Sequence, residues 1–522
     1  MDHAVNTGIG GIGAWATRRA FLSGERTAFI EGHRRVTFAE FDRRTDQLAQ
    51  ALRGTGVRSG DRVGALMVNS VAFLETMFAA AKLGAIFAPM NFRLAAPEVS
   101  FLLADSGADV FVWSRECSTL ARDALAADGA RVRTRVVVGG EPIAGELDFE
   151  ELLAHGSSTA PGIDVDGRDI CALVYTSGTT GRPKGVMLTH DNMVWNAINY
   201  LSGGRGLTEG DRTVTVAPMF HSGGLGVHTL PLIYIGGTTT MMSAFDAEET
   251  LAAMARERVT VQFLVPAMWA ALMAVPDVEE YDLSSLELAV TGGAPCPLPV
   301  LEFFQGRGVP FQEGFGLTET APGATLLDAA HMKEKLGSIG RPMFHVSTRI
   351  VDEQDREVPV GDVGELLIRG PNVFAGYWGR PDATAEAFRG GWFHTGDLGR
   401  VDAEGFITLV DRKKDMVITG GENVYPIEVE QVLYRHPAVR EVAVVGVPHE
   451  KWGETPIAVV ALADATTVAA EELIAYARER LAHFKCPTRV EFVSELPRTA
   501  SGKVLKTALR TNFGGCESSV DR

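Results

Sequence analysis

The sequence has few cysteines and a deficit of positive charge. Its five cysteines are odd in number and show no C-x-x-C spacing; they are Cys117, Cys171, Cys296, Cys486 and Cys516. This pattern predicts reduced thiols in a cytoplasmic protein and argues against a zinc site. The net charge is −17, from 49 Lys and Arg against 66 Asp and Glu. That balance argues against nucleic acid or an anionic membrane surface as the main partner, but it leaves open a small anionic ligand held by local groups.

Long apolar runs are also missing. No stretch approaches the roughly 18 consecutive apolar residues that a membrane span needs, so we expect no membrane span, while peripheral contact through an apolar patch stays open. The first residues lack a basic segment followed by an apolar one, so we expect no signal peptide and a cytoplasmic location. The "GIGGIG" at 8–13 has the glycine spacing of a dinucleotide-binding loop, but no strand precedes it. We interpret it as a flexible N-terminal segment.

Strand-like and helix-like pieces alternate through the first third of the chain. The pattern predicts strands over 26–32, 61–67 and 85–91, with helices over 36–56 and 69–83 between them. A further helix over 96–108 and a strand over 109–114 continue the order. Such alternation favours α/β layers with largely parallel strands.

The helix expected over 36–56 shows clear end signals. Thr37 and Glu40 have the spacing of a capping box, and Gly54 marks the end. The apolar residues of one face are Phe41, Leu48 and Leu52.

The pattern changes along the chain. The α/β alternation continues from 168 to about 345, and short strands with tight turns predict a small β subdomain over 345–410. The charged stretch "DRKKD" at 411–415 then precedes a segment long enough to fold by itself, as expected of an exposed linker. At 522 residues the chain exceeds one hydrophobic core. We expect an α/β fold: a large N-terminal domain of layered α/β subdomains with the small β subdomain, and a smaller mobile α+β C-terminal domain.

One stretch, "YTSGTTGRPKGV" at 175–186, concentrates hydroxyls and glycines directly after an apolar run that reads as a buried strand ending at Tyr175. Its hydroxyls belong to Thr176, Ser177, Thr179 and Thr180, its glycines are Gly178, Gly181 and Gly185, and Lys184 adds a positive charge. Glycines let backbone N–H groups approach a ligand closely, so the stretch predicts polyphosphate binding. It is not a Walker A loop, because it has no Gly-Lys-Ser/Thr triplet. A merely flexible surface loop is the alternative.

The same stretch resembles the signature loop of the adenylate-forming superfamily, which includes acyl-CoA synthetases, 4-coumarate–CoA ligases, luciferase and peptide-synthetase adenylation domains. Eight further motifs of that superfamily follow in order: "PMFHSGG" at 218–224, "TGGAP" at 291–295, "GFGLTET" at 314–320, "GSIGRP" at 337–342, "GELLIRGPNVFAGYW" at 364–378, "GWFHTGD" at 391–397, "DRKKDMVITGGENVYPIEVE" at 411–430 and "PRTASGKVLK" at 497–506. The resemblance covers nearly the whole chain and is greatest to bacterial fatty-acyl-CoA synthetases and coumarate-type ligases.

The resemblance implies an acid–CoA ligase that uses ATP, Mg²⁺ and coenzyme A. In that family a carboxylate attacks the α-phosphate of ATP, giving an acyl-adenylate and pyrophosphate, and the CoA thiol then displaces AMP. The protein mainly positions reactants and stabilises charge on phosphate oxygens. The implied partners are therefore a small carboxylic acid, ATP and CoA, with no nucleic acid.

The resemblance assigns the nucleotide site residue by residue. The phosphate group comprises Thr176, Ser177, Gly178, Thr179, Thr180 and Lys184, and the adenine and ribose groups comprise Gly292, Gly293, Ala294, Pro295, Phe315, Gly316, Asp397 and Arg412. Thr318 is expected at the α-phosphate and Glu319 on Mg²⁺, since hard cations prefer carboxylate oxygen. Family members often have tyrosine where this chain has Phe315, which keeps the stacking face and loses the hydroxyl. Structural roles for Phe315 and Glu319 are the alternatives.

The resemblance also implies a moving C-terminal domain. Lys503 corresponds to the lysine that reaches the reacting carboxylate and α-phosphate, and Lys506 is expected to be solvated. Lys414 matches the hinge position, which gives an N-terminal adenylation domain over 1–411, a hinge over 412–414 and a mobile domain over 415–522. Gly420 and Gly421 are expected to line the pantetheine channel.

The acid is expected near residues 221–224. His221 would border the acyl site, and Ser222, Gly223 and Gly224 leave room for an acyl chain or aryl ring. No aspartate or arginine in this stretch would pair with an amino-acid ammonium or a second carboxylate. The sequence leaves open whether the acid is a fatty acid or a cinnamate-like acid, and whether the protein is a monomer or a homodimer. Two alternative functions also stay open: transfer of the acyl group to a carrier protein or an amine instead of CoA, and an inactive scaffold that binds the adenylate.

Overall fold

The computed structural model describes residues 11–127, 131–176, 183–294, 296–413, 415–419, 422–463, 466–498 and 504–514. The chain forms two compact units. The first unit comprises residues 1–348 and 368–393, and the second comprises 349–367 and 394–522. Calling the fold α/β with a separate C-terminal part is confirmed, whereas the boundaries at 411 and 415 stay predictions.

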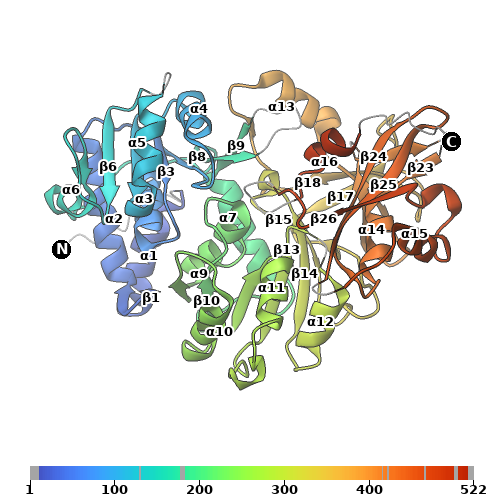
Figure 1. The fold of residues 1–522 in the computed structure, drawn as a ribbon. Coiled ribbons are helices and arrows are strands. Elements are labelled where there is room, and N and C mark those ends of the chain that lie inside the picture. Colours follow the sequence, from blue (N-terminus) through green and yellow to red (C-terminus); the bar gives the residue numbers. More distant parts are fainter. Residues whose placement is uncertain are drawn as a thin grey trace. The chain divides into compact units, whose positions relative to one another are not determined.

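An eight-stranded sheet organises the start of the first unit (Figure 1). Its strands, in spatial order, are β19 (Gly376–Tyr377), β9 (Lys184–Thr189), β8 (Ile170–Thr176), β4 (Ile86–Pro89), β3 (Arg62–Leu66), β5 (Val110–Ser114), β6 (Thr134–Val138) and β7 (Leu147–Asp148). In this spatial order, neighbouring strands from β8 through β4, β3, β5 and β6 to β7 pair in parallel, as the alternating pattern predicts. At the other edge, β9 pairs antiparallel with β8, and β19 pairs antiparallel with β9.

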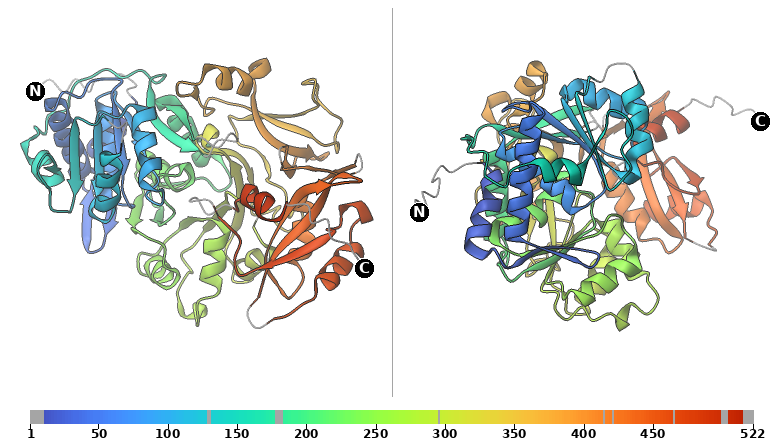
Figure 2. Two further views of the ribbon diagram at one scale, coloured as in Figure 1. Left: turned by 45° about the horizontal axis from the view of Figure 1, so that its top comes forward. Right: turned by 90° about the vertical axis from the view of Figure 1, so that its left-hand side faces the viewer.

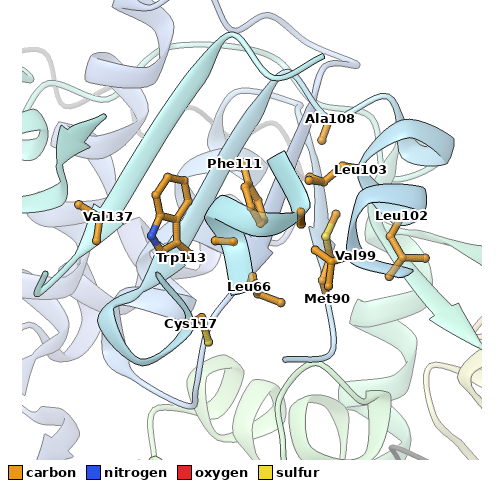
Figure 3. Close-up of a cluster of buried hydrophobic side chains, with 12 residues drawn as sticks. Leu66, Met90, Val99, Leu102, Leu103, Ala108, Phe111, Trp113, Cys117 and Val137 are labelled. Atoms are coloured by element: carbon orange, nitrogen blue, oxygen red, sulfur yellow. The ribbon is translucent and has the colours of Figure 1, made fainter. Parts of the chain in front are cut away.

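Apolar side chains fill one face of this sheet. The helices α4 (Ala96–Ser106) and α5 (Ser118–Ala126) share a core with β3, β5 and β6. Figure 3 shows the rings of Phe111 and Trp113 next to each other, 5.3 Å between centroids, with Val99 and Leu103 of α4 beside them. Burying these side chains supplies most of the stabilisation of this layer, at about 1.5–3 kcal/mol for each large apolar side chain.

The helices α1 (Gly13–Ser23), α2 (Phe38–Gly54) and α3 (Val71–Lys82) pack against one another (Figure 2). The Phe78 ring of α3 contacts Trp15 of α1 and Phe41 of α2. The α2 start is as predicted, because the Thr37 side chain accepts a hydrogen bond from the Glu40 N–H at 3.1 Å. The Glu40 carboxylate, however, pairs with Arg34 at 2.6 Å. The predicted face is confirmed: its three apolar residues, Phe41, Leu48 and Leu52, are all buried.

The interpretation of 8–13 as a flexible segment is wrong for the part that the structure describes. Residues 11–13 are buried, and Gly13 begins α1. A Cβ at Gly11 would lie 2.3 Å from the His190 ring, and one at Gly13 would lie 2.7 Å from the backbone nitrogen of Lys82. These glycines therefore allow close packing around the start of α1.

Two further sheets complete the first unit. One contains β10 (Arg212–Thr215), β11 (Thr238–Met241), β1 (Thr27–Glu31) and β2 (Arg34–Thr37), and the other contains β12 (Val261–Leu264), β13 (Leu288–Gly292), β14 (Phe311–Gly316), β15 (Gly323–Leu327) and β16 (Arg341–Pro342). The other α-helices of the first unit are α6 (Phe149–His155), α7 (His190–Ser202), α8 (Ser222–Gly226), α9 (Thr229–Ile235), α10 (Ala247–Arg256), α11 (Pro266–Met273), α12 (Leu298–Gln305) and α13 (Pro381–Ala387). Because β12, β13 and β14 are parallel, their carboxyl ends lie at one edge. Ligands of α/β sheets bind at such edges.

The predicted small β subdomain corresponds to β17 (Ser347–Val351), β18 (Gly364–Arg369), β20 (Phe393–Val401) and β21 (Ile407–Arg412). A five-stranded sheet follows, with β22 (Val417–Thr419), β23 (Glu422–Val424), β24 (Val439–His449), β25 (Gly453–Leu462) and β26 (Arg489–Val493). The helices α14 (Pro426–Tyr434) and α15 (Ala470–Arg478) share one core with this sheet, and α16 (Lys506–Phe513) shares another. Alternating residues of β24 enter these two cores, as a period of two requires.

The prediction that Lys506 is solvated is wrong. Its ammonium lies 2.8 Å from Glu430 Oε1, and its side chain is only 17% exposed. Burial alone would lower the Lys506 pKa, but the facing carboxylates of Glu430 and Asp411 outweigh it, and the pKa is raised.

Among the described helices, none is long and apolar enough to cross a bilayer.

Candidate functional site

The base of the predicted phosphate loop is a strand pair. Thr176 ends β8, Lys184 begins β9, and the two are Cα partners in the antiparallel register. Both side chains are half-buried. The loop residues Ser177, Gly178, Thr179 and Thr180 lie outside the described residues. The structure thus places the two ends of the predicted loop directly opposite each other.

A polar network holds the strand that leads into this loop. The Tyr175 hydroxyl donates to Asp105 Oδ2 at 3.0 Å, and Arg380 donates to Asp105 Oδ1 at 2.8 Å. Burial, together with the Asp105 charge, raises the pKa of Tyr175 well above its ordinary range. Tyr175 therefore remains a neutral donor, and the network ties β8 to α4 and to the segment after β19.

Glu319 lies on a single turn of 3₁₀ helix, Thr318–Thr320, and is 9% exposed. Its Oε1 accepts a hydrogen bond from the Tyr377 hydroxyl at 3.0 Å, and its carbonyl accepts from the Phe374 N–H at 2.8 Å. Tyr377 also faces Lys184, whose Nζ lies 4.9 Å from the ring centroid. The structure therefore brings the predicted phosphate lysine and the predicted magnesium ligand to one tyrosine.

The donor set fits a magnesium ion held mainly by a nucleotide. Mg²⁺ in such sites takes one or two carboxylates together with substrate phosphates and water. Glu319 supplies one anchored carboxylate, and the described residues contain no cluster of three or more His, Cys, Asp or Glu that could hold a metal ion by itself.

The predicted acid site adjoins the predicted α-phosphate residue. His221 precedes α8 as its N-cap residue, and the Ser222 hydroxyl lies 3.3 Å from that of Thr318. Aromatic rings accompany them, with Phe220 4.4 Å from the His221 ring and 5.2 Å from the Phe92 ring between centroids. Gly224 is buried, and only glycine fits there, because a Cβ would lie 2.4 Å from the Pro218 carbonyl oxygen.

Close backbone packing explains the glycines of the predicted adenine wall. A Cβ at Gly292 would lie 2.6 Å from the Gly314 carbonyl, and one at Gly316 would lie 1.6 Å from the Pro322 carbonyl. Gly293 has a φ of +86°, which favours glycine. Ala294 is exposed and Phe315 is half-buried on β14, whereas Pro295 lies outside the described residues.

Sequence reasoning missed Phe263. Its half-buried ring on β12 lies 3.4 Å from the position of a Cβ at Gly223 and 3.8 Å from that at Gly292. The ring therefore lies between the predicted acid site and the predicted adenine wall. The sequence carries no signal for this, because an apolar residue in the run "VQFLV" reads as ordinary core.

Sequence reasoning also missed Glu313, which is 7% exposed on β14 and pairs in register with Thr291 of β13. Burial raises the pKa of Glu313 to about 7, although the Cys296 N–H donates to its carboxylate and opposes the shift. A buried carboxyl that changes charge near neutral pH therefore lies in the strand that also carries Phe315.

The remaining predicted residues belong to the second unit or lie outside the described residues. Asp397 and Arg412 are Cα partners on β20 and β21, and Arg412 Nε lies 2.6 Å from Asp397 Oδ1. Asp397 is buried, at 4% exposure, and Arg412 holds one of its carboxylate oxygens. Lys414, Gly420, Gly421 and Lys503 lie outside the described residues. The structure therefore does not test the roles predicted for Asp397 and Arg412 toward the nucleotide, or those predicted for the four residues outside the described part.

Comparison with known proteins identifies the family. The model of the family "AMP-binding enzyme" matches residues 17–378, and that of the "AMP-binding enzyme C-terminal domain" matches 428–503. A feruloyl-CoA synthase of Amycolatopsis sp is 47% identical over 504 residues, covering 97% of this chain and 99% of the relative. A long-chain-fatty-acid–CoA ligase, FadD13 of Mycobacterium tuberculosis, is 37% identical over 505 residues, covering 96% and 98%.

Among solved structures, the anthranilate CoA ligase AuaEII in complex with anthranoyl-AMP has a TM-score of 0.90 and 31% identity, covering 96% of this chain and 97% of that one. The motifs, the fold and these full-length matches agree. The chain belongs to the AMP-binding enzymes of the adenylate-forming superfamily and is an ATP-dependent, AMP-forming acid–CoA ligase.

Proposed function

We propose that this enzyme activates an aromatic carboxylic acid, of the hydroxycinnamate kind, as its CoA thioester. The observation that carries the proposal is similarity over the whole chain. The relative named for a feruloyl product is 47% identical, against 37% for the relative named for long-chain fatty acids. The solved structure that matches at a TM-score of 0.90 holds another aromatic acyl group as its adenylate.

The geometry of the first unit supports an aryl group. The Phe263 ring lies against the position of Gly223, where any side chain would approach the ring edge. Phe220 and Phe92 form a second aromatic pair beside His221. Flat rings pack favourably edge to face or offset against such side chains. We place Ser222, Gly223 and Gly224 along the acid and His221 at its carboxylate end.

The first half-reaction needs charge stabilisation rather than covalent help from the protein. In this proposal Thr176, Lys184 and the hydroxyls of the loop at 177–180 hold the β- and γ-phosphates. Thr318 donates to the α-phosphate, and its 3.3 Å distance from Ser222 brings the acid site next to that phosphate. Glu319 would hold Mg²⁺, which supplies positive charge to the phosphate oxygens when bound. Gly292, Gly293, Ala294, Pro295, Phe315 and Gly316 would hold adenine.

In this proposal the remaining roles belong to residues of the second unit. Asp397 would accept hydrogen bonds from the ribose hydroxyls, and Arg412 would reach ribose or phosphate. Lys503 would stabilise the negative charge that develops when the carboxylate attacks, with Lys414 as the hinge between 1–411 and 415–522. Gly420 and Gly421 would line the channel that admits the pantetheine arm in the second half-reaction. We place the reaction in the cytoplasm, where ATP and CoA are available.

An acid panel tests the proposal. Purified enzyme with ATP, Mg²⁺ and CoA is given 4-hydroxycinnamate, ferulate, benzoate, hexanoate, dodecanoate and palmitate, and CoA thioesters are detected by mass. The proposal expects kcat/KM for a hydroxycinnamate at least tenfold above that for any fatty acid. A fatty acid that equals or exceeds the cinnamates would refute the aryl assignment. Exchange of pyrophosphate without any thioester would instead indicate another acceptor.

Substitution at Gly223 tests where the acid lies. The Gly223→Ala change places a Cβ 3.4 Å from the Phe263 ring, which is tolerable contact. The Gly223→Val change adds two methyl groups that we expect to crowd the ring and the adjoining acid site, and overpacking of this kind costs about 1–3 kcal/mol. We expect kcat/KM for the best aromatic acid to fall about 10- to 100-fold in the valine variant. The control is Gly210→Ala, whose Cβ meets only Thr208 at 3.6 Å; an equal loss in the control, or none in the valine variant, would contradict the placement.

A further inference from the structure

Tyr377 contacts both of the charged residues assigned to the triphosphate. Its hydroxyl donates to Glu319 Oε1 at 3.0 Å, and the Lys184 ammonium lies 4.9 Å from its ring centroid. Glu319 and Lys184 are far apart in the chain, and Tyr377 belongs to a third segment. One side chain therefore serves an anion through its hydroxyl and a cation through its ring face.

The surrounding backbone holds Tyr377 in place. Strand β19 pairs with β9, so that the Ala375 N–H donates to the Met187 carbonyl at 2.9 Å and the Trp378 N–H donates to the Gly185 carbonyl at 2.8 Å. The Tyr377 N–H donates to Thr384 Oγ1 at 2.9 Å. These bonds join the tyrosine to the strand that begins with Lys184, so the tyrosine and the lysine share one rigid frame.

The segment is joined to Glu319 as well. The Phe374 N–H donates to the Glu319 carbonyl at 2.8 Å, and the Phe374 ring packs edge-on against the Tyr377 ring at 4.9 Å between centroids. The position of the carboxylate relative to the tyrosine is therefore set by backbone and side chain together.

We propose that Tyr377 is a positioning residue for adenylation, which orients the Glu319 carboxylate through its hydroxyl and holds the Lys184 ammonium over its ring before ATP binds. The inference rests on the proposed roles of these two residues toward Mg²⁺ and the phosphates. Because the hydroxyl donates to Oε1, it favours one orientation of the carboxylate. Fixing both groups in advance lowers the conformational entropy lost when the nucleotide binds.

Two substitutions separate the two contacts. Tyr377→Phe removes the hydroxyl and keeps the ring, whereas Tyr377→Leu removes both. ATP binding without acid is measured by titration calorimetry, once in excess Mg²⁺, once across a Mg²⁺ series and once in EDTA. The matched control is Tyr281→Phe, which removes a hydroxyl from a loop of the same unit that carries no assigned residue.

For Tyr377→Phe we expect the Mg²⁺ concentration for half-maximal ATP binding to rise about threefold to tenfold, with binding in EDTA unchanged. For Tyr377→Leu we expect the same rise and, in addition, ATP binding in EDTA weakened about twofold to fivefold, since the ring no longer holds the lysine. ATP–pyrophosphate exchange should fall in the same order. The control should match the wild type in every measurement.

Unchanged Mg²⁺ dependence in Tyr377→Phe would overturn the inference, as would a Tyr377→Phe variant that loses binding in EDTA as fully as Tyr377→Leu. If Tyr377→Leu does not fold, the Mg²⁺ series of Tyr377→Phe still decides. A wild-type enzyme that binds MgATP and makes fatty-acyl thioesters at least as well as hydroxycinnamoyl thioesters would end the aryl proposal and leave this inference standing. A wild type that binds no MgATP would overturn both.

Discussion

Glu313→Gln is predicted to make the protein more stable at alkaline pH and to leave it unchanged at acidic pH. Glu313 is 7% exposed, and burial raises its pKa to about 7 from an ordinary 4.5. The neutral form is therefore favoured in the folded protein. The amide of glutamine has nearly the same shape and retains an oxygen that can accept from the Cys296 N–H.

The magnitude follows from the pKa. At about 1.4 kcal/mol for each tenfold change in proton affinity, a pKa of about 7 against 4.5 corresponds to about 3 kcal/mol. Because the folded-state pKa exceeds that of the unfolded chain, protonated Glu313 stabilises the fold fully below about pH 4.5. That contribution is lost as the pH rises to 7 and above. Glutamine does not titrate, so it avoids the loss.

The assay is thermal unfolding of both proteins from pH 5 to pH 8.5. We expect a small advantage for Glu313→Gln near pH 5 that grows until the pH passes about 7 and then stays constant, on the order of a few °C at pH 8.5. The control is Glu279→Gln, which makes the same charge change at an exposed position and should show no such divergence. A Tm difference that stays constant with pH, or a variant that is less stable at every pH, would refute the reasoning.

Two ion pairs that are largely shielded from solvent lead to further predictions. Lys506→Met removes the ammonium between the Glu430 and Asp411 carboxylates, so the free energy of unfolding of the second unit should fall by about 2–4 kcal/mol in thermal or urea unfolding. Lys506→Arg should retain most of that stability. An unchanged unfolding midpoint for Lys506→Met would contradict the placement of Lys506 between these carboxylates. Arg44→Met leaves the Glu75 carboxylate, 1% exposed, without its guanidinium and should cost about 3–5 kcal/mol. The double change Arg44→Met with Glu75→Met should regain most of that loss, and a fully additive loss would contradict the pairing.

Local chemistry made parts of the fold predictable. The Thr37 hydroxyl caps α2 as expected, because a cap depends only on residues three positions apart. The apolar run ahead of the glycine-rich loop forms β8 and ends at Thr176, one residue beyond the predicted end. The other half of the capping box does not form as predicted, because the Glu40 carboxylate pairs instead with Arg34 of β2, the strand that directly precedes α2.

The sequence by itself determined the α/β order of elements, the family and the acid–CoA ligase chemistry, because caps, periodicity and ordered motifs are encoded in neighbouring residues. Only the tertiary structure decided which distant side chains meet. Strand pairing of β9 with β19 brings Tyr377 to Lys184, parallel pairing of β12 with β13 places Phe263 beside Gly292, and helix docking buries Lys506. Such contacts depend on sheet register and on packing between segments far apart in the chain, so local residue patterns do not predict them.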